Sequence, residues 1–167
     1  MDRLVATTDF VCLAALVAAL VVAAVSDLRT RIVPNGCAAT VAAAGILRAL
    51  VRATAGGAGA GALVSSLLGV VVVFAVMLCA ALVSSRGGRG RGVGGGDVKL
   101  LAAVGAWTGP VLGLATVGLS CLVGVAGWFA YRVAVALRDA DRPVRPGIPL
   151  APSIAVVSVF IVLVGVL

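Results

Sequence analysis

Two aspartates of this sequence border long apolar segments, where an acidic side chain is unexpected. Asp27 closes an apolar run that begins near Phe10, and Asp97 follows a run of glycines and precedes another apolar segment. The whole chain has only six acidic residues, all of them aspartates. Ionisable groups at or near a bilayer are costly and mark functional sites by default, so we take Asp27 and Asp97 as candidate catalytic residues.

Two aspartates on one face of a membrane can carry out the chemistry of an aspartyl protease. An ionised carboxylate takes a proton from the water that attacks the scissile carbonyl, and a protonated carboxyl donates to the carbonyl oxygen. Two close carboxylates do not both ionise readily, so the pKa of one rises and the pair divides these roles. The chain has no histidine, which excludes Ser-His, Cys-His and His-ligated zinc mechanisms. We therefore expect a water nucleophile, with no metal and no cofactor.

Several neighbours of the two aspartates are candidates for binding the substrate or supporting the loops. The glycines before Asp97 allow close approach of an extended peptide and unusual backbone dihedrals. Lys99 either biases the electric field at Asp97 or extends to the membrane surface, and the sequence does not separate these roles. The candidate supporting residues are Gly94, Gly95, Gly96, Lys99, Pro34 and Asn35.

Both aspartates also have simpler structural explanations. Asp27 is explained about equally well as a helix-end acid that pairs with Arg29 or Arg31. Asp97 is explained as the N-cap of the helix that follows, since Asp is favoured at that position. Capping is compatible with catalysis, so the second explanation does not remove Asp97 from the candidates.

The composition is that of a polytopic helical membrane protein. Of the 167 residues, 62% are hydrophobic and 11% are charged, whereas soluble domains have roughly 25% charged residues. Lipid-exposed backbone must be hydrogen-bonded internally, so long apolar runs predict helices. We expect a single all-α domain (1–167), a bundle of about six transmembrane helices. The expected spans are 10–25, 37–50, 63–83, 98–108, 111–131 and 150–166.

The fourth expected span is short or broken. Its 11 residues (98–108) cover about half of a bilayer at roughly 1.5 Å per residue. Gly109-Pro110 then interrupts the helix. Glycines at 57 and 61, and at 109 and 113, form two candidate sites of close helix packing.

The basic residues predict which ends of the spans share a side of the membrane. The side that holds Arg3, Arg48 and Arg52 has only these three of the 13 cations. The loops on the other side hold Arg29, Arg31, Arg86, Arg89, Arg91, Lys99, Arg132, Arg138, Arg142 and Arg145. This positive-inside bias places both termini outside the plasma membrane, with Asp27 and Asp97 together at the cytoplasmic side.

The cysteines and tryptophans are expected to have structural roles. Trp107 and Trp128 are interpreted as anchors at the membrane interface. The cysteines occur singly inside apolar segments, which argues against a zinc site or a disulfide framework and favours small buried hydrophobes. They are Cys12, Cys37, Cys79 and Cys121.

Three motifs resemble the signatures of the type IV prepilin peptidase and preflagellin peptidase family, the GxGD membrane aspartyl proteases. GGGDVKLLAAVGAW (94–107) closely resembles the GxGD segment. SDLRTRIVPN (26–35) resembles the other signature, an Asp at the end of the first helix followed by basic residues and Pro-Asn. IPLAP (148–152) resembles the proline pattern that opens the last helix. The motifs occur in the family's order and extend over nearly the whole chain.

The resemblance implies a membrane aspartyl endopeptidase that removes basic leader peptides from prepilin-like precursors at the cytoplasmic face. Asp27 and Asp97 match the two catalytic aspartates of the family. Larger members have an N-terminal insertion with paired cysteines and also methylate the new pilin N-terminus. This chain has no such insertion, so it resembles the small, peptidase-only branch that serves tight-adherence (Flp) pili or archaeal preflagellins. The implied partners are a prepilin-like substrate and the lipid bilayer, with no nucleic acid.

Two functions of other classes stay open on the sequence alone. A small transporter or channel subunit would use Asp27 and Asp97 to bind protons or cations at a helix break. A non-catalytic membrane scaffold would need neither carboxyl group for chemistry. Cleavage of a co-expressed prepilin distinguishes the peptidase from both.

Overall fold

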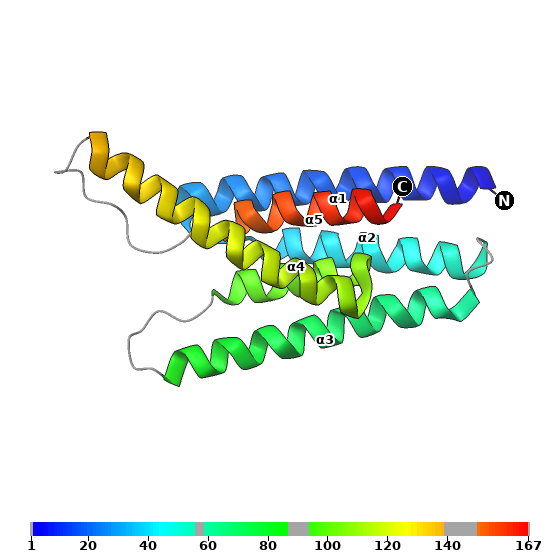
Figure 1. Ribbon diagram of the computed structural model, residues 1–167. Coiled ribbons are helices and arrows are strands. Elements are labelled where there is room, and N and C mark those ends of the chain that lie inside the picture. The colour runs from blue at the N-terminus through cyan, green and yellow to red at the C-terminus, as the bar shows by residue number, and fades with distance from the viewer. Residues whose placement is uncertain (1, 56–58, 87–93, 139–149, 167) are drawn as a thin grey trace.

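The computed structural model describes residues 2–55, 59–86, 94–138 and 150–166, which form a bundle of α-helices (Figure 1). These described ranges contain no β-strand. The predicted all-α bundle is therefore confirmed. The helices are α1 (Asp2–Thr30), α2 (Asn35–Thr54), α3 (Gly59–Arg86), α4 (Gly95–Arg138) and α5 (Ala151–Val166).

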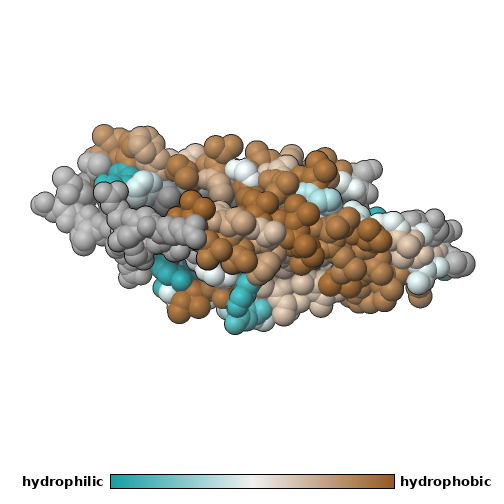
Figure 2. Space-filling model, turned by 90° about the horizontal axis from the view of Figure 1, so that it is seen from below, coloured by the Kyte–Doolittle hydropathy of each residue, from teal (hydrophilic) through white to brown (hydrophobic). Residues whose placement is uncertain are grey.

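The described helices have the length and apolar surface of a multi-pass membrane protein. The helices α1 to α4 are each long and apolar enough to cross a bilayer. The 16 residues of α5 extend only about 24 Å, somewhat less than the roughly 30 Å of the hydrocarbon core. Figure 2 shows a surface dominated by apolar side chains, and many large hydrophobic residues are exposed. Such a surface suits contact with lipid rather than water.

The helix α4 consists of two limbs that meet at Gly109. This glycine has φ 71° and ψ −175°, which is not a helical conformation, and Pro110 follows it. Glycine adopts positive φ at little cost, whereas other residues rarely do. Figure 1 shows the second limb (110–138) turning back toward the end of the bundle at which the first limb (95–108) begins. The predicted break at Gly109-Pro110 is confirmed, and both ends of α4 lie at the same end of the bundle.

The first limb of α4 forms the centre of the hydrophobic core. Its 14 residues extend about 21 Å and are too short to cross a bilayer. Leu100 and Val104 are fully buried in one apolar cluster with Leu16 and Leu20 of α1 and Ile154 of α5. The surrounding helices therefore shield this short helix from lipid.

Glycines allow α3 to approach both limbs of α4 closely. A Cβ atom added at Gly105 would lie 2.5 Å from the carbonyl oxygen of Gly69 in α3. A Cβ atom at Gly113 would lie 2.8 Å from Val73, and one at Gly109 would lie 2.7 Å from a serine hydroxyl of α3. The expected close packing at Gly109 and Gly113 is confirmed. It is wrong at Gly61, where a Cβ atom would meet nothing within 4 Å, and Gly57 lies outside the described residues.

Two expectations for individual side chains are wrong. Cys79 and Cys121 are exposed, whereas the other two cysteines are buried as expected. Both exposed thiols lie on apolar helices, where a small, weakly polar group is tolerated against lipid. Trp107 is buried, and its Nε1 donates a hydrogen bond of 2.9 Å to the carbonyl oxygen of Val41. It is a core residue because the first limb that carries it lies inside the bundle.

The contact between Gly105 and Gly69 predicts that a single methyl group destabilises the bundle. Gly105→Ala forces α3 and α4 apart, and overpacking of this kind costs about 1–3 kcal/mol of unfolding free energy. The matched control is Gly118→Ala in the second limb, since a Cβ atom there meets nothing within 4 Å. That control gains about 0.5–1 kcal/mol from helix propensity. Equilibrium unfolding in mixed micelles measures both values, and equal effects would contradict the close packing.

Candidate active site

The structure brings Asp27 and Asp97 to the same end of the bundle. Figure 1 shows that α1 ends, and α4 and α5 begin, at this end. Asp27 is buried in the last turn of α1, with 7% of its surface exposed, and Asp97 is half-buried in the first turn of α4. Two carboxyl groups 70 positions apart in the sequence thus lie at one end of the bundle, and we call them the aspartate pair.

Asp27 receives its hydrogen bond from the start of α5. The backbone N–H of Ala151, the first residue of α5, donates to Oδ2 of Asp27 at 3.2 Å. The amino end of a helix carries a partial positive charge, so α5 supplies both a donor and a favourable dipole. No ion pair between Asp27 and Arg29 occurs in the described part of the chain, so the expected pairing of these two residues is not supported. The sequence indicated where α5 begins but not that its backbone bonds to Asp27.

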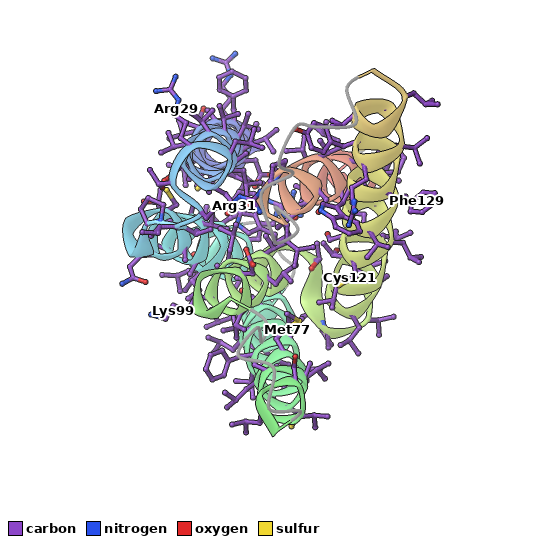
Figure 3. All side chains as sticks on the ribbon, turned by 90° about the vertical axis from the view of Figure 1, so that its left-hand side faces the viewer. Arg29, Arg31, Met77, Lys99, Cys121 and Phe129 are labelled. Carbon is purple, nitrogen blue, oxygen red and sulfur yellow. The ribbon has the colours of Figure 1, made fainter. Side chains whose placement is uncertain are left out.

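The end of α1 fixes the direction of the following chain. The N–H of Arg31 donates to the carbonyl oxygen of Asp27 at 2.9 Å, and Arg31 has φ 57°. This is the left-handed conformation that commonly ends a helix. Figure 3 looks onto this end and shows Arg29 on the outside of α1, whereas Arg31 lies nearer the middle, among α1, α2 and α5.

Asp97 does not cap α4, because Gly94 occupies the N-cap position. The carbonyl oxygen of Gly94 accepts the N–H of Asp97 at 3.0 Å and the N–H of Val98 at 3.2 Å. The Oδ1 atom of Asp97 is buried and has no hydrogen-bond partner among the described residues. Buried polar atoms are nearly always hydrogen-bonded, so an unpartnered carboxyl oxygen indicates a group that bonds to water or substrate. The N-cap explanation for Asp97 is therefore wrong.

The three glycines before Asp97 differ in what surrounds them. A Cβ atom at Gly96 would lie 2.9 Å from Val33, and one at Gly94 would lie 3.1 Å from Oδ2 of Asp97. A Cβ atom at Gly95 would meet nothing within 4 Å. Gly95 and Gly96 are helical, so the expected unusual dihedrals are wrong for these two residues. The glycines instead allow close contact, one of them with the segment before α2 and another with the catalytic candidate.

Lys99 and Asn35 join the beginnings of α4 and α2. The Nζ atom of Lys99 donates a hydrogen bond of 3.1 Å to Oδ1 of Asn35, the first residue of α2. Pro34 precedes α2 in an extended conformation, with φ −63° and ψ 134°. Figure 3 shows Lys99 directed outward from α4 on the side of α2. Lys99, Asn35 and Pro34 thus support the loops around the site, and Lys99 bonds to Asn35 instead of to Asp97.

The described part of the site fits acid–base chemistry on water. No group of three or more His, Cys, Asp or Glu side chains that could hold a metal ion occurs among the described residues. One carboxylate has a fixed backbone donor, and the other has an unpartnered oxygen. This asymmetry suits a general base and a general acid that act on one reacting group.

Comparison with known proteins gives a family match. The model of the type IV leader peptidase family matches residues 14–129. The matched range contains Asp27, Asp97 and the segment that joins α1 to α2, and it ends before α5. No curated protein and no solved structure matches the chain.

The contact of Gly96 with Val33 predicts a difference between neighbouring glycines. Gly96→Ala pushes the start of α4 away from the segment before α2 and lowers the stability of the folded protein by about 1–3 kcal/mol. Gly95→Ala, the matched control one residue earlier, faces open space and leaves stability unchanged within about 0.5 kcal/mol. Thermal unfolding in detergent compares the two variants. Equal midpoints would show that α4 does not rest on Val33.

Proposed function

The chain belongs to the type IV leader peptidase family, and on this premise we propose that Asp27 and Asp97 are its catalytic residues. Membership of the family makes the chain a peptidase, and its long apolar helices make it a multi-pass membrane protein. The proposed activity is that of an aspartyl endopeptidase. The main support is the unpartnered, buried oxygen of Asp97 at the end of the bundle that also holds Asp27.

Asp27 is the proposed general base. The N–H of Ala151 and the amino end of α5 stabilise negative charge on its carboxylate. The ionised carboxylate takes a proton from water, and the resulting hydroxide attacks the carbonyl carbon of the scissile peptide bond. Asp27 is buried, so bulk solvent has little access to its carboxylate.

Asp97 is the proposed general acid. In its protonated form it donates to the carbonyl oxygen as the tetrahedral intermediate forms, so no net charge builds up on that oxygen. Collapse of the intermediate breaks the C–N bond. The proton taken by Asp27 passes to the leaving amine, and the hydroxyl of the intermediate returns a proton to Asp97. Both carboxyl groups are then in their starting states.

The proposed substrate is a prepilin-like precursor, of the tight-adherence (Flp) type or a related one, with a short basic leader. Its apolar helix lies in the bilayer beside the bundle while the leader reaches the aspartate pair from the cytoplasmic side. The orientation rests on the ten cations that border this end in the sequence. The basic residues of the leader contact anionic lipid headgroups at this side of the membrane.

Both catalytic residues are expected to be essential. Asp27→Asn removes the base and Asp97→Asn removes the acid, and loss of general acid–base catalysis typically costs about 100- to 10,000-fold in rate. The assay is co-expression with a candidate prepilin and measurement of the leader-cleavage shift on a gel. Asp2→Asn is the matched control, because α1 begins at Asp2, at the opposite end of the bundle.

Retained cleavage in either Asp27→Asn or Asp97→Asn contradicts the assignment of the pair. Loss of cleavage in Asp2→Asn as well would indicate a general loss of protein instead of a specific role. A protein that cleaves no prepilin but moves protons or cations across vesicles through the same two residues would support the transporter alternative.

The pH dependence of cleavage should be bell-shaped. At low pH both carboxyl groups are protonated and no base is present, so kcat/KM rises as the first proton leaves. At higher pH the second proton leaves and the acid is lost, so kcat/KM falls again. Cleavage of a prepilin by the purified protein in vesicles, measured from acid to neutral pH, tests this shape. A flat profile through the acid range contradicts a pair that shares one proton.

A further inference from the structure

A second charged cluster lies at the end of the bundle opposite the aspartate pair. Asp9 of α1 contacts two arginines of α2 through both of its carboxylate oxygens. Nε of Arg48 lies 3.0 Å from Oδ1 of Asp9, and Nη2 of Arg52 lies 2.6 Å from Oδ2. Nε of Arg52 also donates to both oxygens, at 3.3 and 3.2 Å. We call Asp9, Arg48 and Arg52 the charged cluster.

The charged cluster has one more positive than negative charge. Arg48 is buried, with 9% of its surface exposed, and its guanidinium lies 5.4 Å from the centre of the Trp107 ring. Only Nε of Arg48 is bonded to an acceptor among the described residues. Asp9 balances one of the two guanidinium groups, so the other retains its charge. A buried excess charge is costly unless an ion of opposite sign compensates it.

An apolar cavity lies directly beside this excess charge. Its volume is about 190 Å³, and it is lined by Asp9, Phe10, Leu13, Arg48 and Trp107. Phe10 is 74% exposed, so the cavity adjoins the lipid-facing side of α1. Positive charge beside an apolar cavity that adjoins lipid suits a molecule with an anionic head and a hydrocarbon tail.

The depth of the cluster in the bundle also suits a lipid headgroup. Arg52 lies in the last turn of α2, and its side chain is 36% exposed, so one guanidinium faces outward at the end of an apolar helix. Guanidinium groups pair with phosphate in a two-pronged geometry that ammonium groups do not match. In the sequence, Arg48 and Arg52 were two of the three cations on the side with few positive charges. A specific anionic ligand gives them a role that membrane topology does not.

We propose that the charged cluster binds one anionic phospholipid. The phosphate contacts Arg52 and the unbonded nitrogens of Arg48, and an acyl chain lies along Phe10 and into the cavity beside Trp107. Bound lipid would compensate the excess charge and hold α1, α2 and the end of the first limb of α4 together. The site is independent of the proposed peptidase reaction and lies at the other end of the molecule.

Native mass spectrometry of the full-length protein in detergent micelles tests this site. Phosphatidylglycerol and phosphatidylcholine are titrated against the wild type and against Arg52→Gln, Arg52→Lys and Arg3→Gln. We expect the wild type to bind phosphatidylglycerol about five- to tenfold more tightly than phosphatidylcholine. Arg52→Gln should lose this preference, and Arg52→Lys should retain part of it. Arg3→Gln is the matched control, because Arg3 is an exposed arginine near the start of α1 at the same end.

Four results would overturn the proposal, the last of them if Arg52→Gln does not fold. Equal affinity of the wild type for both lipids excludes a selective anionic site. An equal loss of preference in Arg3→Gln and Arg52→Gln indicates general attraction between charges. Inorganic phosphate that displaces phosphatidylglycerol at equal concentration shows that the acyl chain contributes nothing, so the ligand is phosphate and not lipid. If Arg52→Gln does not fold, Arg52→Lys provides the test instead. A preference of Arg52→Lys for phosphatidylglycerol as strong as that of the wild type would overturn the proposal, because the two-pronged contact of a guanidinium with phosphate would then not be required.

Discussion

The first limb of α4 is a helix too short to cross the membrane, and the rest of the structure is built around it. The backbone groups in its middle are hydrogen-bonded within the helix. The unpaired N–H and C=O groups at its ends would face hydrocarbon if the other helices did not surround it. Packing against α2, α3 and α5, in one apolar cluster with residues of α1, places its first turn, with Asp97, at the end of the bundle that also holds Asp27. The reversal at Gly109 and the close approach of Gly69 to Gly105 make this burial possible.

Local signals in the sequence predicted much of this arrangement. Gly109-Pro110 marks a break because glycine adopts positive φ readily and proline lacks the N–H that a helix needs. The count of basic residues placed Asp27 and Asp97 on one side. The contact of Ala151 with Asp27 was not predicted, since it joins residues 124 positions apart in the chain. The burial of Trp107 was missed for the same reason. Its environment is set by α1 and α2, which no pattern within its own segment reveals.

Carboxyl groups at the two ends of the bundle have different hydrogen-bonding environments. Asp9 is surrounded by two guanidinium groups that occupy both of its oxygens, so it is committed to binding within the protein. In the described ranges, Asp27 has a single backbone donor and Asp97 has a free oxygen. A carboxyl group with an unbonded oxygen can bond to water or substrate that enters the site and exchange a proton with it. A carboxylate held by two arginines cannot readily do so. Among the six aspartates of the chain, pairing with arginine thus distinguishes Asp9, a structural acid, from the catalytic candidates Asp27 and Asp97.

We propose that Asp27 and Asp97 form one unit that holds a single proton. Isotope-edited infrared spectroscopy of the protein in vesicles, with labelled aspartate, detects a protonated carboxyl group directly through its C=O stretch. We expect one such band at the pH of maximal cleavage, lost in Asp97→Asn and shifted in Asp27→Asn. A spectrum without this band, or a band unchanged by both substitutions, would contradict the shared-proton pair.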